Sequence, residues 1–154
     1  MTVTSWIVIR VRGTIHARRD IEETLRFLHL TRPNHATVVP DRPELRGMLY
    51  KVQGYVTWGE ASPETVTLLL SERGVTTDGR AVSAPAPEGQ VALSIDDLSK
   101  STLANGLYAV GTIRPLFRLK APKGGWRSTK KPFRSGGALG YRGTAINDLA
   151  RRMV

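Results

Sequence analysis

Three segments near the N-terminus have the residue types of β-strands: residues 5–12, 36–39 and 55–58. They are rich in Val, Ile, Thr and Trp, which favour the pleated surface of a sheet. Gly13 follows the first segment and Pro40 follows the second, and both residue types interrupt a strand. The pattern predicts three short strands with other structure between them.

Apolar residues recur at helical spacing in five further segments. The predicted helices span residues 20–28, 41–52, 62–73, 94–106 and 143–153. Asp20 and Glu23 have the D-x-x-E form of a capping box, and both acids suit the positive end of a helix dipole. Ser62 followed by Pro63 is a strong helix start, because Ser caps the first turn and Pro fits the backbone angle there.

Residues 5–73 therefore alternate strand and helix three times, with short connections. Residues 75–93 contain Gly, Pro, Ala, Ser and Thr without periodicity, so we expect a loop or linker there. We predict another short strand at residues 116–119. From residue 121 to residue 142, Gly, Lys, Arg and Pro dominate, and we expect an extended or irregular segment that cannot pack a core.

The chain has 154 residues, which is the size of one domain with an appendage. It contains no Cys, which excludes disulfides, zinc knuckles, Cys nucleophiles and iron–sulfur clusters. No apolar stretch approaches the roughly 18 residues of a membrane span. Arg10 and Arg12 stand where a signal peptide needs its apolar centre. We expect a soluble cytoplasmic protein.

The positive charge is confined to the C-terminal part of the chain. Residues 1–111 hold 12 basic and 12 acidic residues, whereas residues 112–154 hold 11 basic residues and a single acid, Asp148. Such asymmetry indicates a polyanionic partner, either nucleic acid or an anionic membrane surface. The 17 Arg against 6 Lys favour structured nucleic acid, because a guanidinium matches phosphate oxygens and stacks on bases. Arg-rich codon usage explains the ratio equally well, but it does not explain the segregation of charge.

The sequence gives little support for a metal site or a catalytic site. The three histidines, His16, His29 and His35, lack the i, i+4 spacing of a helical zinc pair. The carboxylate pairs at 22–23 and 96–97 are adjacent in sequence, so their side chains do not face each other on a helix. We interpret them as acids at helix starts. The sequence therefore predicts no catalytic residue, no metal site, no cofactor and no small-molecule substrate.

Basic residues alternate with aromatic residues in the C-terminal segment. Charges bind phosphates, and flat rings stack on unpaired bases. The predicted RNA-binding residues of this segment are Arg114, Arg118, Lys120, Lys123, Trp126, Arg127, Lys130, Lys131, Arg134 and Arg142. A solvated, disordered tail is the alternative. The glycines at residues 136–143 form a G-x-x-G pattern without the preceding helix of an RNA-clamping loop, which favours a flexible segment.

The R-G-M helix at residues 41–52 supplies a second group of candidates. Arg46 and Lys51 cannot both be buried, so we expect them to project outward near Asn34, in a turn that also holds Arg32. Gly47 would cost about 0.8–1 kcal/mol relative to Ala in a helix interior. We infer that RNA or another backbone passes close to this glycine.

Several motifs resemble the large-subunit ribosomal protein L30 family. They are L-T-R-P-N-H-A-T-V-V at residues 30–39 and R-G-M-L-Y-K-V at residues 46–52. The V-T-W-G-E segment at residues 56–60, followed by S-P-E-T, is similar to the archaeal and eukaryotic branch, and so is L-K-A-P-K-G-G at residues 119–125. The short bacterial form resembles residues 5–60 only, whereas the long archaeal form covers essentially the whole chain.

The resemblance implies an α+β fold with a βαβαβ core, in which two helices cover one face of a three-stranded antiparallel sheet. We expect this core in residues 1–60, a helical extension in residues 61–111 with a loop at 75–93, and an extended, basic RNA-binding segment in residues 112–154. The implied function is that of a non-catalytic structural constituent of the large (50S) subunit. Its implied partners are large-subunit ribosomal RNA and neighbouring ribosomal proteins.

Two other functions remain open on the residues alone. An RNA-processing or RNA-modifying enzyme with a basic anchor would need a convergent acid–base or cofactor site, and no such constellation is evident. A protein that binds an anionic membrane surface would need an amphipathic helix with a large apolar face, which the basic segment does not offer.

Overall fold

The computed structural model describes residues 5–13, 15, 17–82, 95–108, 111, 113–126 and 128–154. Its centre is a six-stranded sheet. The strands are β1 (Ser5–Arg10), β2 (His35–Pro40), β3 (Val56–Glu60), β4 (Phe117–Arg118), β5 (Ser128–Pro132) and β6 (Gly137–Tyr141). They lie in the order β4-β2-β1-β3-β6-β5. The pairs β1–β2, β1–β3 and β2–β4 are antiparallel, and the pairs β3–β6 and β5–β6 are parallel.

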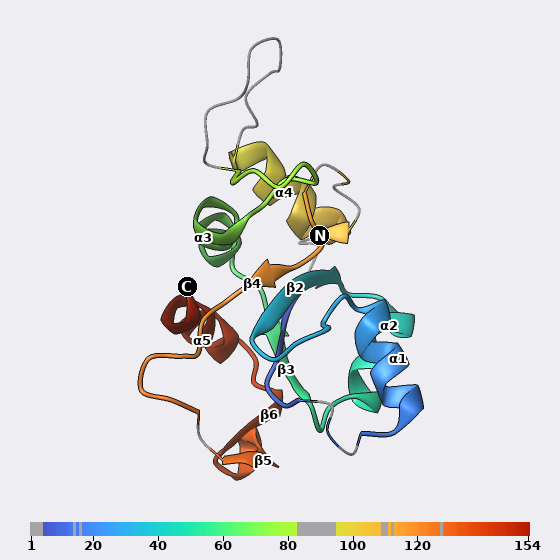
Figure 1. The fold of residues 1–154 in the computed structure, drawn as a ribbon. Coiled ribbons are helices and arrows are strands. Elements are labelled where there is room, and N and C mark those ends of the chain that lie inside the picture. Colours follow the sequence, from blue (N-terminus) through green and yellow to red (C-terminus); the bar gives the residue numbers. More distant parts are fainter. Residues whose placement is uncertain are drawn as a thin grey trace.

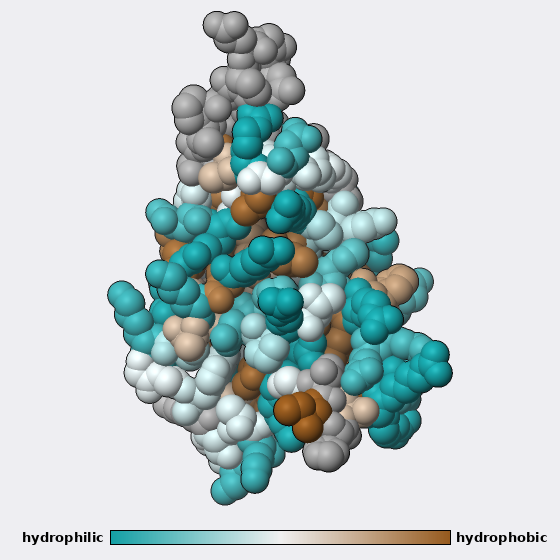
Figure 2. All heavy atoms as spheres, viewed as in Figure 1, coloured by the Kyte–Doolittle hydropathy of each residue, from teal (hydrophilic) through white to brown (hydrophobic). Residues whose placement is uncertain are grey.

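Helices cover both faces of the sheet (Figure 1). They are α1 (Arg19–Phe27), α2 (Pro43–Lys51), α3 (Pro63–Arg73), α4 (Ile95–Asn105) and α5 (Ala145–Met153). Leu25 of α1 and Leu49 of α2 are buried with Val8 on one face. On the other face, Ile9 lies in a core cluster with residues of α3, α4 and α5. Hydrophilic side chains cover the outer side of α1 and α2 (Figure 2), as expected for amphipathic helices.

The predicted βαβαβ core is present. Val8, in the middle strand β1, pairs with Thr37 of β2 and with Trp58 of β3, and both neighbours run antiparallel to β1. The prediction of a three-stranded sheet is wrong, because the C-terminal segment adds strands at both edges. Ala36 pairs with Phe117 of β4, and Thr57 pairs with Gly140 of β6. The Thr57 hydroxyl also donates to the Gly140 carbonyl at 2.7 Å.

Residues 121–142 are partly extended, as predicted, but the prediction that they cannot pack a core is wrong. Strands β5 and β6 and a 3-10 turn (Phe133–Ser135) occupy most of it. Ala138 and Leu139 are buried with Val11, and Trp126 packs against them. Glycine makes this packing possible, since a Cβ on Gly137 would lie 1.9 Å from the Lys131 carbonyl oxygen. The segment therefore packs a core against residues of the chain itself.

The helix starts follow the sequence in one case and depart from it in another. Ser62 caps α3 as predicted, because its hydroxyl accepts a hydrogen bond from the Thr65 N–H at 3.2 Å. Asp20 does not cap α1. The cap residue is Arg18, and Asp20 lies in the first turn, where Arg18 donates to its carboxylate at 2.6 Å. Because α1 already begins at Arg19, Asp20 lies inside the helix and cannot be its cap residue.

Part of the predicted loop at 75–93 lies within the described residues. The chain turns back on itself here, because Thr76 N–H donates to the Arg80 carbonyl at 2.7 Å and Val75 bridges to Ala81. Thr76 also bridges to Ile113, which links the turn to the C-terminal segment. Residues 83–93 lie outside the described residues, as does Ser94, where the helix that became α4 was predicted to start.

Candidate nucleic-acid interface

A first basic cluster forms where β2 begins and β4 ends. Asn34 adopts a left-handed backbone with φ of 68°. Its N–H donates to the Arg10 carbonyl at 2.8 Å, and its carbonyl accepts from the Leu119 N–H at 3.2 Å. The next residue, His35, pairs with Arg118 of β4. The structure thus brings together predicted residues from distant parts of the chain, namely Arg32 and Asn34 with Arg118.

His35 lies among the cations of this cluster. Burial lowers the pKa of the imidazole first, and the positive charges of Arg118, Arg32 and Arg10 lower it further. Within the described parts of the chain, His35 Nδ1 and Asn34 Oδ1 are buried without a hydrogen-bond partner. The imidazole is therefore held neutral beside three guanidinium groups. Arg32 and Arg118 are exposed, whereas Arg10 is buried and donates to the Leu30 carbonyl at 2.8 Å.

A second basic group consists of the lysines of the C-terminal segment, which we call the lysine group: Lys120, Lys123, Lys130 and Lys131. All four are exposed. The main chain of Lys120 donates to the Met153 carbonyl at 2.9 Å, and that of Lys123 donates to the Arg152 carbonyl at 3.1 Å. Lys130 and Lys131 lie on β5, at the edge of the sheet. The backbone is fixed while the ammonium groups face solvent, which suits contact with phosphates.

Two predicted RNA-binding residues make contacts within the fold. Arg142 donates from Nε to the Thr57 hydroxyl and from Nη2 to the Ala138 carbonyl, each at 2.8 Å. Its guanidinium also lies 4.9 Å from the centre of the Phe133 ring. Trp126 is half-buried and packs against the core. The sequence could not separate these residues from exposed ones, because the distinction depends on how β6 pairs with β3.

The remaining predicted residues vary in their surroundings. Arg114 is half-buried. Lys51 is exposed and lies 3.8 Å from the Asp20 carboxylate, which links α2 to α1. Arg134 is exposed in the turn before β6. Arg127 lies outside the described residues.

Arg46 is exposed, as predicted, but it does not lie near Asn34. Its guanidinium donates to both carboxylate oxygens of Asp41, at 2.7 and 2.8 Å, and lies 5.5 Å from the centre of the Trp6 ring. Trp6 and Arg10 are four residues apart along β1, about 13 Å at ~3.3 Å per residue, and Asn34 contacts the Arg10 end. The hydrogen bonds from Arg46 hold the pKa of Asp41 below its ordinary value.

Arg46 borders an aromatic cleft that the sequence did not indicate. The cleft has a volume of about 620 Å³. We call it the aromatic cleft; it is lined by Trp6, Asp41, Arg46, Tyr50, Gln53, Trp58, Glu60, Pro132, Arg134, Leu139, Gly140 and Tyr141. It exists because α1 and α2 pack over β1, β2 and β3, whereas the sheet continues to β6 and β5. The helical spacing of Arg46 and Tyr50, four residues apart, was the one local signal.

Strand register assembles the rings of the aromatic cleft. Trp58 pairs with Tyr141 across β3 and β6, and their ring centres are 6.4 Å apart. Tyr50 of α2 meets Trp58 edge-on at 6.0 Å. The Tyr141 hydroxyl donates to the Glu60 carboxylate, and this hydrogen bond raises the pKa of the phenol. Tyr141 is therefore a neutral hydrogen-bond donor at physiological pH.

Other kinds of site find no support in the structure. Within the described ranges, no three His, Asp or Glu side chains gather in a way that could hold a metal ion. Among the helices that the structure describes, none combines the length and the apolar character needed to cross a membrane.

The family model that matches this chain and the similar proteins agree with each other. A family model described as ribosomal protein L30p/L7e matches residues 6–56. The large ribosomal subunit protein uL30 of Methanopyrus kandleri is 43% identical over 149 residues, which cover 94% of this chain and 100% of the relative. The uL30 protein of Methanosphaera stadtmanae is 40% identical, with coverage of 97% and 99%. That of Korarchaeum cryptofilum is also 40% identical, with coverage of 96% and 93%.

Proposed function

Because this chain belongs to the ribosomal protein L30p/L7e family, we propose that it is a structural constituent of the large ribosomal subunit that binds and stabilises large-subunit ribosomal RNA. The role is non-catalytic and is carried out on the ribosome, in the cytoplasm. The observation that carries the proposal is the match to archaeal uL30 proteins over nearly the whole length of both chains. Such a match includes the basic C-terminal segment as well as the core.

The distribution of charge supports RNA as the partner. The net charge of +10 resides in residues 112–154. In our proposal these residues are the RNA-binding extension of the core formed by residues 1–60, and residues 61–111 are a helical extension between them. Cations that neutralise phosphates release counterions, and this supplies most of the sequence-independent affinity for nucleic acid.

Two exposed basic regions are the proposed phosphate contacts. One is the cluster of Arg32 and Arg118 at the β2–β4 end of the sheet, and the other is the lysine group near β5 and α5. Hydrogen bonds to other elements hold the main chain at Asn34, Lys120 and Lys123, so the backbone of these regions is positioned before RNA arrives. Preorganised contacts lose less conformational entropy on binding. Neighbouring ribosomal proteins would cover other surfaces.

An RNA-modifying enzyme is the alternative function, and it would need a convergent acid–base site. The test is sedimentation of a native lysate of the source organism through a sucrose gradient, with this chain detected by antibody. We expect it to co-migrate with the large subunit in moderate salt and to shift to free fractions when the RNA is digested. Recovery at the top of the gradient in intact lysate would contradict the proposal.

A further inference from the structure

We propose that the aromatic cleft between α2 and β6 binds an unstacked base of the ribosomal RNA. This inference rests on the proposed function, from which it takes RNA as the partner. The cleft volume of about 620 Å³ lies within the roughly 300–1,000 Å³ of small-ligand sites. Sequence-specific RNA recognition commonly uses bases that are splayed out of a helix and stacked on aromatic side chains.

Exposed rings are the first observation. Tyr50 is 62% exposed and Tyr141 is 43% exposed, whereas Trp58 between them is 4% exposed. The two tyrosines are thus the accessible rings of an aromatic cluster whose central ring, that of Trp58, is buried. The planes of Tyr50 and Trp58 meet at 90°, and those of Trp58 and Tyr141 meet at 49°. The flat faces of these rings are therefore not stacked on each other. A planar base could cover one of these faces, which would remove apolar surface from water.

Polar groups at the rim are the second observation. The carboxylates of Glu60 and Asp41 each accept one side-chain partner, Tyr141 and Arg46 respectively, and each retains capacity to accept from the amino group of a base. Gln53 adds an amide that can both donate and accept. Base edges present donors and acceptors side by side, so a mixed rim of this kind matches them better than a purely cationic rim would.

An arginine also lines the cleft. Arg134 is exposed, and no carboxylate lies within ion-pair distance of it in the described part of the chain. A nucleotide whose base enters the cleft carries a phosphate about one sugar away from the ring. Arg134 is the lining cation that could meet this phosphate, because Arg46 is already paired with Asp41.

The surface beside Tyr50 leaves room for an RNA backbone. Gly47 lies three residues before Tyr50 on α2, so the two are neighbours on the helix surface. Gly47 is exposed, and a Cβ there would meet no atom within 4 Å. Internal packing therefore does not require glycine at this position. A strand that delivers a base to the cleft would pass over this position and would benefit from the missing side chain.

The experiment measures binding of the full-length protein to large-subunit ribosomal RNA purified from the source organism. The variants are Tyr50→Ala, Tyr50→Leu and Tyr50→Phe. Leu retains apolar cover over Trp58 without a flat ring, so it keeps the test valid if the Ala variant loses stability. Tyr108→Ala is the matched control, because Tyr108 is 73% exposed and lies outside the cleft.

We expect the Ala and Leu variants to lower affinity about 5- to 150-fold, the loss of one stacked base, with an unchanged salt dependence. The Phe variant and the Tyr108 control should bind as the wild type does. Zero-length ultraviolet crosslinking should attach a nucleotide to Tyr50, Trp58 or Tyr141.

Wild-type affinity in the Leu variant would overturn the inference, and so would nucleotide crosslinks confined to residues outside the cleft. In either case the proposed function would stand. Absence of specific RNA binding by the wild-type protein would instead contradict the proposed function.

Discussion

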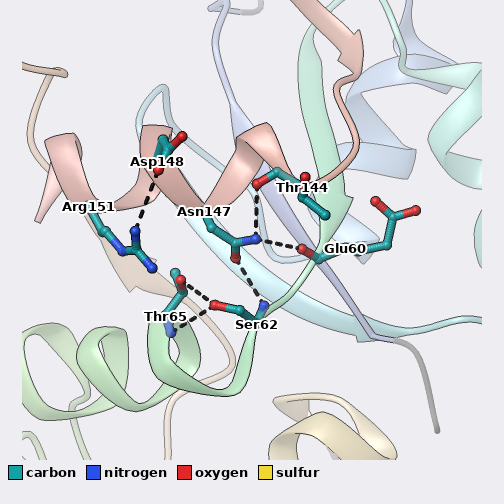
Figure 3. A network of polar contacts seen from close by, with 7 residues as sticks. All are labelled: Glu60, Ser62, Thr65, Thr144, Asn147, Asp148 and Arg151. Atoms are coloured by element: carbon teal, nitrogen blue, oxygen red, sulfur yellow. Dashed lines mark hydrogen bonds and ion pairs between the residues drawn. The ribbon is translucent and has the colours of Figure 1, made fainter.

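Asn147 of α5 holds Ser62 at the start of α3: its Oδ1 accepts a hydrogen bond from the Ser62 N–H at 3.0 Å (Figure 3). The Asn147 amide also donates to the Glu60 carbonyl at 3.1 Å and to the Thr144 carbonyl at 3.0 Å. One buried side chain therefore joins the last helix to the connection between β3 and α3. The C-terminal segment is attached to the core by specific polar contacts as well as by apolar packing.

Replacement of Asn147 tests this attachment. In Asn147→Ala, the Ser62 N–H and the Glu60 carbonyl lose their partner in a partly buried setting, which costs about 1–3 kcal/mol. We expect the free energy of unfolding to fall by this amount in a urea titration. Asn105→Ala is the matched control, because Asn105 is exposed at the end of α4. Equal stability of the two variants would show that the contacts of Asn147 contribute little.

Gly137→Ala tests whether β5 and β6 are packed in the free protein. A Cβ at Gly137 would lie 1.9 Å from the Lys131 carbonyl oxygen, so the strands must separate. We expect destabilisation of about 1–3 kcal/mol or more, as for other overpacked sites. Gly47→Ala adds the same methyl group where no atom lies within 4 Å. If Gly137→Ala melted like the wild type, the C-terminal strands would not be formed without RNA.

We also expect Gly47→Ala to stabilise the free protein but to weaken its binding to RNA. In the free protein it should raise the free energy of unfolding by about 0.8–1 kcal/mol, because Ala is the better helix former and the site is exposed. On ribosomal RNA it should weaken binding if the backbone passes close to this position. Gly54→Ala, which also meets no atom within 4 Å, controls for the added methyl group. Undiminished affinity of Gly47→Ala would contradict close approach.

Local pattern was sufficient to predict the elements whose signals lie within one segment. Strands β1 to β3 are short segments rich in β-branched residues and Trp, and α3 begins at a Ser-Pro pair. Strands β5 and β6 have no such signal. The sequence G-A-L-G-Y of β6 contains two glycines, and its pairing partner Thr57 lies more than 80 residues earlier. Such a strand forms because a partner is available, and a reading of local propensity finds only a flexible segment.

The features of the candidate site also divide into those that the sequence indicates and those that depend on the fold. Charge segregation correctly indicated exposed lysines such as Lys130, because a long cation on an edge strand remains in solvent. It could not indicate that Arg142 would be used within the fold. The proximity of Arg46 to Trp6 depends on how α2 crosses the sheet, and that of Trp58 to Tyr141 depends on strand register. Neither relation has a signal in sequence spacing.

The buried histidine of the β2–β4 cluster predicts a pH dependence of stability. The pKa of His35 is lowered in the folded state, first by burial and then by Arg118, Arg32 and Arg10. The unfolded chain therefore binds a proton at a higher pH than the folded chain does. The contribution is fully present above the unfolded pKa of about 6.5 and is lost as the pH falls towards the folded pKa.

We expect the free energy of unfolding to decline between about pH 7 and pH 5, and His35→Gln should show a smaller decline over this interval. Urea titrations at several pH values measure both slopes. The comparison uses the change in stability with pH, so a constant loss caused by the substitution does not matter. An unchanged slope in His35→Gln would mean that other groups cause the dependence.

In the proposed function, the basic C-terminal segment contacts ribosomal RNA phosphates. Removal of residues 112–154 cannot test it, because this segment supplies β4, β5, β6 and α5 to the fold. The suitable variant replaces the lysine group with glutamine: Lys120, Lys123, Lys130 and Lys131. The control removes four exposed cations elsewhere: Arg18, Arg19, Arg26 and Lys100.

The deciding measurement is a salt titration of the affinity of both variants and the wild type for the same large-subunit ribosomal RNA fragment. Log affinity falls with log salt, and each lost phosphate contact reduces the steepness of this fall by about 0.7–0.9. Loss of all four lysines should therefore reduce the steepness by about three units. The control variant should keep a slope near that of the wild type. Equal slopes for the wild type and the lysine variant would contradict phosphate contacts by the lysine group.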